Sequence, residues 1–201
     1  MKRVIRLAIA CACVALPVML AGAASAQTIS LSEGDPATYD WTGVYAKGGL
    51  SIGFPNEPAN NFKPKPGAAV AFGGGYRFNP WIAAELDMNV TAGSDLRGVK
   101  DDLLIFAFTM NLKTYPLADT GDDLLPAWVQ PYILFGFGGG VVDADDAGDE
   151  SSFMMRFNLG SEFMVWDNIG LFFDTGYMVI ENGDSQLDGT GQMVVGALYR
   201  F

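Results

Sequence analysis

From residue 41 onward, hydrophobic and polar residues alternate along the chain in runs separated by clusters of Gly, Pro, Asn and Asp. Alternation of this kind is typical of β-strands, whose successive side chains point to opposite faces of a sheet. No run shows the 3.6-residue period of an amphipathic helix. The pattern therefore predicts an all-β fold with eight strands. They cover residues 41–54, 67–79, 81–91, 103–115, 127–141, 153–166, 169–180 and 191–201.

One face of each predicted strand is bulky and apolar, and the other holds small or charged residues. Leu86 and Val90 share a face in the third strand, for example, while Glu85 and Asp87 lie opposite. Glycine makes up much of the second face. The charged residues inside the predicted strands all belong to it: Lys47, Arg77, Glu85, Asp87, Lys113, Arg156, Glu162, Asp174 and Arg200.

The small, sparsely charged face is the one that suits a crowded interior. A barrel of about eight strands is just wide enough inside for side chains to fill it. The apolar face then meets lipid, where a closed barrel pairs every backbone polar group. We predict an eight-stranded antiparallel up-and-down transmembrane β-barrel over residues 41–201. The alternative is a soluble sandwich or lipocalin-like barrel with the apolar face inside, but its outer face should be densely polar.

The first 26 residues have the three parts of a secretory signal peptide. Lys2, Arg3 and Arg6 form a basic start, residues 7–20 an apolar run, and Ala24-Ser25-Ala26 a cleavage site. A polar tail follows at 27–40. Both cysteines lie in the part that would be removed, so we expect no disulfide in the mature chain.

Composition excludes several classes of function. The chain has no histidine, which rules out imidazole general-base catalysis and histidine metal sites. Its net charge of −11 argues against nucleic acid as a partner. We expect no cofactor and no metal. Glu85 and Asp87 are spaced like a possible carboxylate pair of a glycosidase, but we favour ion pairs that fill the interior and interrupt any water path.

The connections should alternate between short periplasmic turns and longer outer loops. Short turns lie around Asn79-Pro80 and Asp167-Asn168, and the long connections cover 55–66, 92–102, 142–152 and 181–190. The third of these loops is strongly acidic. It departs from the calcium-loop pattern at Ala147 and Met154, so we expect a solvated loop. The link 116–126 is long although it falls on the periplasmic side, and the sequence offers no physical account of it.

The aromatic residues at strand ends predict a girdle at the periplasmic membrane interface, where indole rings are favoured. Its tryptophans are Trp41, Trp81, Trp128 and Trp166, and we expect Tyr115, Tyr199 and Phe201 to join them.

The opening WTGVYAKGG, the hairpins rich in Gly and aromatic residues, and the C-terminal GALYRF resemble small outer-membrane β-barrel proteins of Gram-negative bacteria, the OmpA-like or opacity-type group of porin-like surface antigens. The resemblance implies an outer-membrane location. It also implies that Tyr199 and Phe201 form the signal read by the barrel-assembly machinery. The partners it implies are membrane lipid, lipopolysaccharide and, through the loops, host or extracellular ligands.

Three functions follow, in decreasing order of preference. The first is a structural envelope protein whose outer loops bind partners. The second is a narrow porin-like channel for small solutes, which the inward glycines favour and the ion pairs oppose. An enzyme is the least favoured. The enzymatic outer-membrane barrels that this chain could resemble rely on a histidine, and this chain has none.

Overall fold

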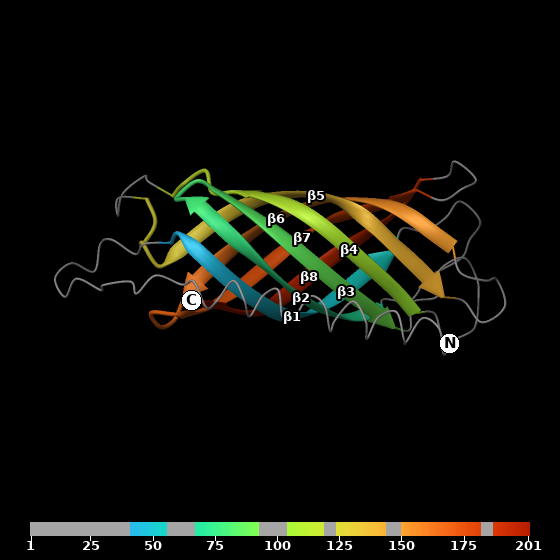
Figure 1. The fold of residues 1–201 in the computed structure, drawn as a ribbon, viewed down its shortest axis with the longest axis horizontal. Helices are drawn as coiled ribbons and strands as arrows, with labels where there is room; N and C mark the ends of the chain where they lie inside the picture. Colours follow the sequence, from blue (N-terminus) through green and yellow to red (C-terminus); the bar gives the residue numbers. More distant parts are fainter. Residues whose placement is uncertain (1–40, 56–66, 93–103, 119–123, 144–149, 182–186) are drawn as a thin grey trace.

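The computed structural model describes residues 41–55, 67–92, 104–118, 124–143, 150–181 and 187–201. Its strands form one closed antiparallel barrel in which each strand pairs with the next along the chain and β8 pairs with β1 (Figure 1). The strands are β1 (Gly43–Pro55), β2 (Gly67–Asn79), β3 (Ile82–Ala92), β4 (Leu104–Thr114), β5 (Val129–Asp143), β6 (Glu150–Met164), β7 (Ile169–Glu181) and β8 (Leu187–Arg200).

The predicted fold is confirmed. Each strand lies on one predicted from the alternation, and no strand end differs from its prediction by more than four residues. The largest difference is at the start of β8, where Leu187 precedes the predicted start at Gly191. Polar and glycine residues there show no alternation, so the pattern could not mark the beginning of the strand. Among the described residues, no helix is long and apolar enough to cross a membrane.

Several predicted segments lie outside the described residues. They include the signal peptide 1–26, the tail 27–40, the central parts of the outer loops, and Asp145, Asp146 and Asp149 of the acidic loop.

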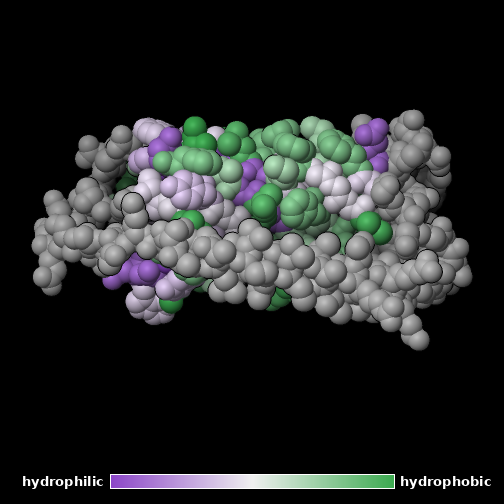
Figure 2. All heavy atoms as spheres, in the orientation of Figure 1, coloured by the Kyte–Doolittle hydropathy of each residue, from purple (hydrophilic) through white to green (hydrophobic). Residues whose placement is uncertain are grey.

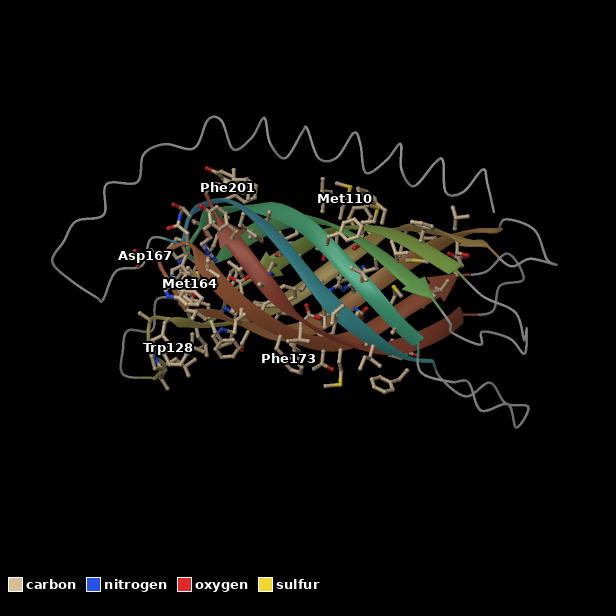
Figure 3. All side chains as sticks on the ribbon, turned by 90° about the horizontal axis from the view of Figure 1, so that it is seen from below. Met110, Trp128, Met164, Asp167, Phe173 and Phe201 are labelled. Atoms are coloured by element: carbon tan, nitrogen blue, oxygen red, sulfur yellow. The ribbon has the colours of Figure 1, made fainter. Side chains whose placement is uncertain are left out.

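The bulky apolar face of the strands points outward. Phe157 and Phe173 expose 51% and 40% of their surface, whereas the side chains of Lys47 and Asp174 are 6% and 0% exposed. Hydrophobic side chains cover the middle of the barrel wall seen in Figure 2. Met110 and Phe173 project from this wall in Figure 3. This orientation excludes the soluble barrel, which would enclose the apolar face.

The interior also contains bulky apolar side chains, so the expectation of an inner face made mostly of small residues and charges was incomplete. One buried cluster joins Trp41, Met164, Phe172, Val194 and Leu198. A second joins Tyr45, Ala83, Tyr115, Tyr132 and Leu134. Apolar and aromatic groups therefore share the interior with the charged groups.

The short turns 79–82 and 165–168 and the C-terminus lie at one end of the barrel, which we call the turn end. Asn79 shapes the first of these turns, because its Oδ1 accepts hydrogen bonds from the backbone N–H groups of Trp81 (2.8 Å) and Ile82 (2.9 Å). Trp128, Asp167 and Phe201 mark the same end in Figure 3.

The link 116–126 has a structural role at the turn end. Its residue Ala118 packs against the buried cluster that contains Tyr115, and the Ala118 N–H donates to the Tyr115 carbonyl at 3.2 Å. The described part of the link therefore adds an apolar contact to the interior at the turn end. This contact supplies the physical account that the sequence lacked.

Candidate functional site: the charged lumen

Eight of the nine charged residues predicted to face inward form one unbranched series of ion pairs. Seven salt bridges of 2.5–3.5 Å join them, and positive and negative groups alternate along the whole series. The order is Arg200, Glu162, Lys113, Glu85, Lys47, Asp87, Arg156 and Asp174. Four positive charges therefore balance four negative charges.

Most of the series joins strands that are not neighbours in the sheet. Lys113 on β4 lies 2.9 Å from Glu162 on β6, and it also lies 2.5 Å from Glu85 on the adjacent β3. Arg156 on β6 reaches Asp87 on β3 at 3.0 Å. The first and last of these pairs therefore link strands that are two and three positions apart around the barrel.

Hydroxyl and amide groups complete the environment of the carboxylates. Tyr45 donates to Glu85 (2.5 Å), Tyr115 to Glu162 (3.1 Å) and Tyr132 to Asp174 (3.1 Å). Each tyrosine brings its ring into the lumen as well, and Lys113 Nζ lies 4.0 Å from the centre of the Tyr132 ring. Buried charges are stable only when they are paired and hydrogen-bonded in this way.

Asn158 and Gln192 extend the same hydrogen-bonded system. Asn158 donates to Asp174 at 2.6 Å and accepts from Gln192 at 3.0 Å. The hydroxyl of Tyr115, the first residue after β4, stays a donor, because burial and the Glu162 carboxylate raise its pKa well above the ordinary value.

Arg77 is the ninth predicted residue, and it forms no ion pair with the described residues. Its guanidinium donates to the carbonyls of Asn79 (3.3 Å) and Pro80 and to Gln130 (3.2 Å). One face of the guanidinium lies 3.6 Å from the centre of the Tyr115 ring. Carbonyl oxygens and aromatic rings thus solvate this cation at the turn end.

The assignment of Trp41 to the outer girdle was wrong. Trp41 is only 6% exposed, and its ring lies 4.4 Å from the Arg200 guanidinium and 5.2 Å from that of Arg77. Arg200 also donates to the Trp41 carbonyl. Cation–π contact with two buried guanidinium groups holds the indole inside, where it covers the lumen at the turn end. Gly43, with φ of 118°, permits the turn between Trp41 and β1.

The other girdle residues are on the outer wall. Trp81, Trp128, Trp166 and Tyr199 are between 41% and 67% exposed. Phe201 packs edge-on against Tyr199 at 5.1 Å. Tyr115 does not join them, because it is fully buried and its hydroxyl binds Glu162 in the lumen.

Inward glycines make room for the large side chains of the lumen. Gly160 pairs with Tyr132, and a Cβ atom added at Gly160 would lie 2.5 Å from Cζ of that ring. Gly196 stands in the same relation to Phe172, at 2.6 Å. The space beside these inward glycines is therefore partly filled by side chains from neighbouring strands.

The two inward carboxylates of β3 are both paired with a cation. Glu85 and Asp87 do not act as a free carboxylate pair, since Lys47 Nζ lies 2.6 Å from one and 3.0 Å from the other. Within the described segments, no three His, Cys, Asp or Glu side chains are grouped to hold a metal ion.

Sequence reasoning missed the inward roles of Tyr45, Tyr115, Leu134 and Phe172. Their positions held a usable signal: Tyr45 is two residues from Lys47, and Tyr115 is two residues from Lys113. Residues two apart in a strand share a face, so each tyrosine should accompany its lysine into the lumen.

Comparison with known proteins supports a membrane barrel. Among solved structures, Neisserial surface protein A (NspA) aligns with a TM-score of 0.59 and 17% identity, over 79% of this chain and 97% of NspA. The outer membrane protein OprG from Pseudomonas aeruginosa aligns with a TM-score of 0.53 and 15% identity, over 79% of this chain and 95% of OprG. At these identities the likeness concerns the fold. No curated protein sequence gives a significant match.

A family model described as outer membrane protein beta-barrel domain matches residues 13–201. That range includes every strand of the barrel. The chain belongs to this family of outer-membrane β-barrel proteins and is located in the bacterial outer membrane.

Proposed function

We propose that this protein is a closed, non-conducting barrel that supports the outer membrane and presents its outer loops for binding. The proposal rests on the burial of the ion-pair series. None of its charged side chains is more than 10% exposed. A water-filled pore would leave such groups hydrated and accessible. Their burial supports a lumen filled by its own side chains.

The binding role is assigned to the loops at 55–66, 92–102, 142–152 and 181–190. Loops on a rigid scaffold commonly carry the binding function of a protein, and the crossed ion pairs make this scaffold rigid. We propose lipopolysaccharide and host or extracellular molecules as loop partners, after export directed by the signal peptide 1–26. No catalytic role is proposed, since every carboxylate of the lumen has a cationic partner.

Tyr199 and Phe201 are proposed as the signal read by the barrel-assembly machinery. Both aromatic rings lie together at the turn end, and Tyr199 is 46% exposed. The surface that an assembly factor would contact is therefore available on the outside of the last strand.

A narrow channel is the second candidate. Gly136, Gly138 and Gly140 leave the inner face of β5 without side chains along much of its length, which favours a passage. Arg156, however, extends from the neighbouring β6 to Asp87 on β3 and crosses this region.

Planar-bilayer recording separates the two functions. The refolded barrel, identified by its altered gel mobility before boiling, should insert without producing a steady conductance. An open porin in the same bilayers serves as the positive control. Steady single-channel steps from the folded protein would favour the channel over the closed barrel.

A second experiment tests the loop function. Cells that carry the barrel with shortened loops should lose binding to lipopolysaccharide or matrix while the barrel stays folded.

A further inference from the structure

Five buried polar atoms on one part of the inner wall have no hydrogen-bond partner among the residues that the structure describes. They are Asp87 Oδ1, Thr109 Oγ1, Asn111 Oδ1 and Nδ2, and Arg156 Nε. The four residues are between 0% and 4% exposed. Buried polar groups in native proteins nearly always have partners, and an unpartnered group there is a sign of a water or ion that binds to it.

The register of the sheet places these residues next to one another. Thr109 on β4 is the direct partner of Asp87 on β3. Asn111 pairs with Gly136 on β5, and Gly136 in turn pairs with Arg156 on β6. Directly paired residues have Cβ atoms about 4.5–5.5 Å apart. The salt bridge from Arg156 on β6 to Asp87 on β3 spans β4 and β5, which carry Thr109, Asn111 and Gly136.

The neighbouring strand β5 has no side chains at the positions paired with two of these residues. Gly136 and Gly138 are the β5 partners of Asn111 and Thr109. The Asn111 amide oxygen lies directly over Gly136, where it would overlap an added Cβ atom. Glycine at position 136 therefore lets the Asn111 amide lie against the backbone of β5, where a larger residue would displace it.

The unpartnered atoms have the chemistry of a hydration site. Arg156 Nε and Asn111 Nδ2 are donors, Asp87 Oδ1 and Asn111 Oδ1 are acceptors, and the Thr109 hydroxyl is both. A buried water molecule typically makes about three hydrogen bonds and uses such a mixture. A cation would bind only the oxygens, and Lys47 and Arg156 already lie 3.0 Å from the other oxygen of Asp87.

We propose that Asp87, Thr109, Asn111 and Arg156 form an internal binding site for ordered water. This water completes the hydrogen bonding of Asp87 and Arg156, and so it is a structural member of the ion-pair series.

The direction of a stability change tests the site. In Thr109→Val and Asn111→Leu, a polar group is replaced by an apolar one of similar shape. If water binds there, each variant removes one of its partners, and the folding equilibrium constant should fall by roughly three- to tenfold. If the atoms are dry, the same changes remove unsatisfied polar groups and should stabilise the barrel. A rise in stability for both variants would overturn the proposal.

Asn158→Leu is the matched control, because Asn158 is a lumen asparagine with two direct hydrogen bonds. It should be destabilising whether or not water is present. Thr109→Val is the milder change and keeps the test usable if Asn111→Leu does not fold. Urea unfolding in lipid vesicles gives the equilibrium constants.

A crystal structure of the refolded wild-type protein provides the direct observation. Density for water within hydrogen-bond distance of Asn111 and Thr109 is expected. Refolding in sodium chloride and in choline chloride at equal ionic strength distinguishes the occupants. Greater stability in sodium that disappears in Thr109→Val would identify a bound cation and overturn water as the ligand.

Discussion

Tyr45 on β1 donates a hydrogen bond of 2.5 Å to Oε1 of Glu85 on β3, two strands away around the barrel. Tyr45 is the last residue of the WTG-x-Y opening. Trp41 of the same motif covers the lumen, and Gly43 makes the turn that leads from Trp41 into β1. The opening of the barrel thus contributes both of its aromatic side chains, Trp41 and Tyr45, to the interior.

Replacing Glu85 by Gln should destabilise the barrel. The change removes a charge that faces Lys47 at 2.6 Å and Lys113 at 2.5 Å, and it leaves both lysines with fewer anionic partners. Breaking a buried ion pair costs about 3–5 kcal/mol. The free energy of unfolding in lipid vesicles should fall by that order, and bilayer recordings should show whether conductance rises.

Glu181→Gln is the matched control, since Glu181 is exposed at the end of β7. It makes the same chemical change without entering the lumen and should leave stability unchanged. Equal stability of wild type and Glu85→Gln would show that the ion-pair series does not hold the walls together.

Trp41 and Trp166 should respond differently to replacement by Ala. Trp41 is 6% exposed inside the barrel, whereas Trp166 is 67% exposed on the girdle. Losing a buried tryptophan costs about 3–5 kcal/mol, so Trp41→Ala should lower the unfolding temperature in detergent and in lipid. Trp166→Ala should act mainly in lipid, where an interface exists. Heat-dependent gel mobility measures both, and similar behaviour of the two variants would contradict the inward position of Trp41.

Gly160→Ala should destabilise the barrel through overlap in the lumen. The new Cβ atom would lie 2.5 Å from Tyr132 Cζ and 2.7 Å from Asp174 Cβ. Overpacking of this kind costs about 1–3 kcal/mol. Gly48→Ala is the control, because the nearest atom to a Cβ there, the Ala71 carbonyl oxygen, is 3.9 Å away. That variant should be neutral or slightly stabilising in urea unfolding, since alanine is less costly than glycine in a strand. Loss of stability in both variants would point to a general intolerance of β-strand changes.

The fold could be predicted because a lipid-facing barrel enforces strict contrast between its faces. Phe157 and Arg156 are neighbours in sequence and lie on opposite sides of the wall. The same parity rule also identifies the inward residues, and it would have placed Trp41 inside, four residues from Tyr45. The preference of tryptophan for a membrane interface competed with that rule. In the structure, cation–π contacts with two guanidinium groups hold the Trp41 indole in the lumen.

The pairing of the lumen residues could not be read from the sequence. Arg156 and Asp87 are 69 residues apart, and their contact depends on the stagger of four strands around the barrel. Arg77 shows the same limit: charge counting suggests a carboxylate partner, but the turn at Asn79 and Pro80 supplies carbonyl oxygens instead.

Phe201→Ala should reduce assembly in cells while leaving the folded barrel nearly as stable as the wild type. The backbone N–H of Phe201 donates to the Val44 carbonyl at 3.1 Å, and that bond survives the substitution. The side chain contacts Tyr199 on the outer surface rather than the lumen. Phe78→Ala is the control, because Phe78 is 58% exposed on β2 and lies outside the C-terminal motif. The amount of heat-modifiable protein in the outer-membrane fraction should drop several-fold for Phe201→Ala alone, with equal refolding yields of both variants in detergent. An equal loss in cells for both would mean that assembly depends on general wall hydrophobicity and not on the terminal aromatic residue.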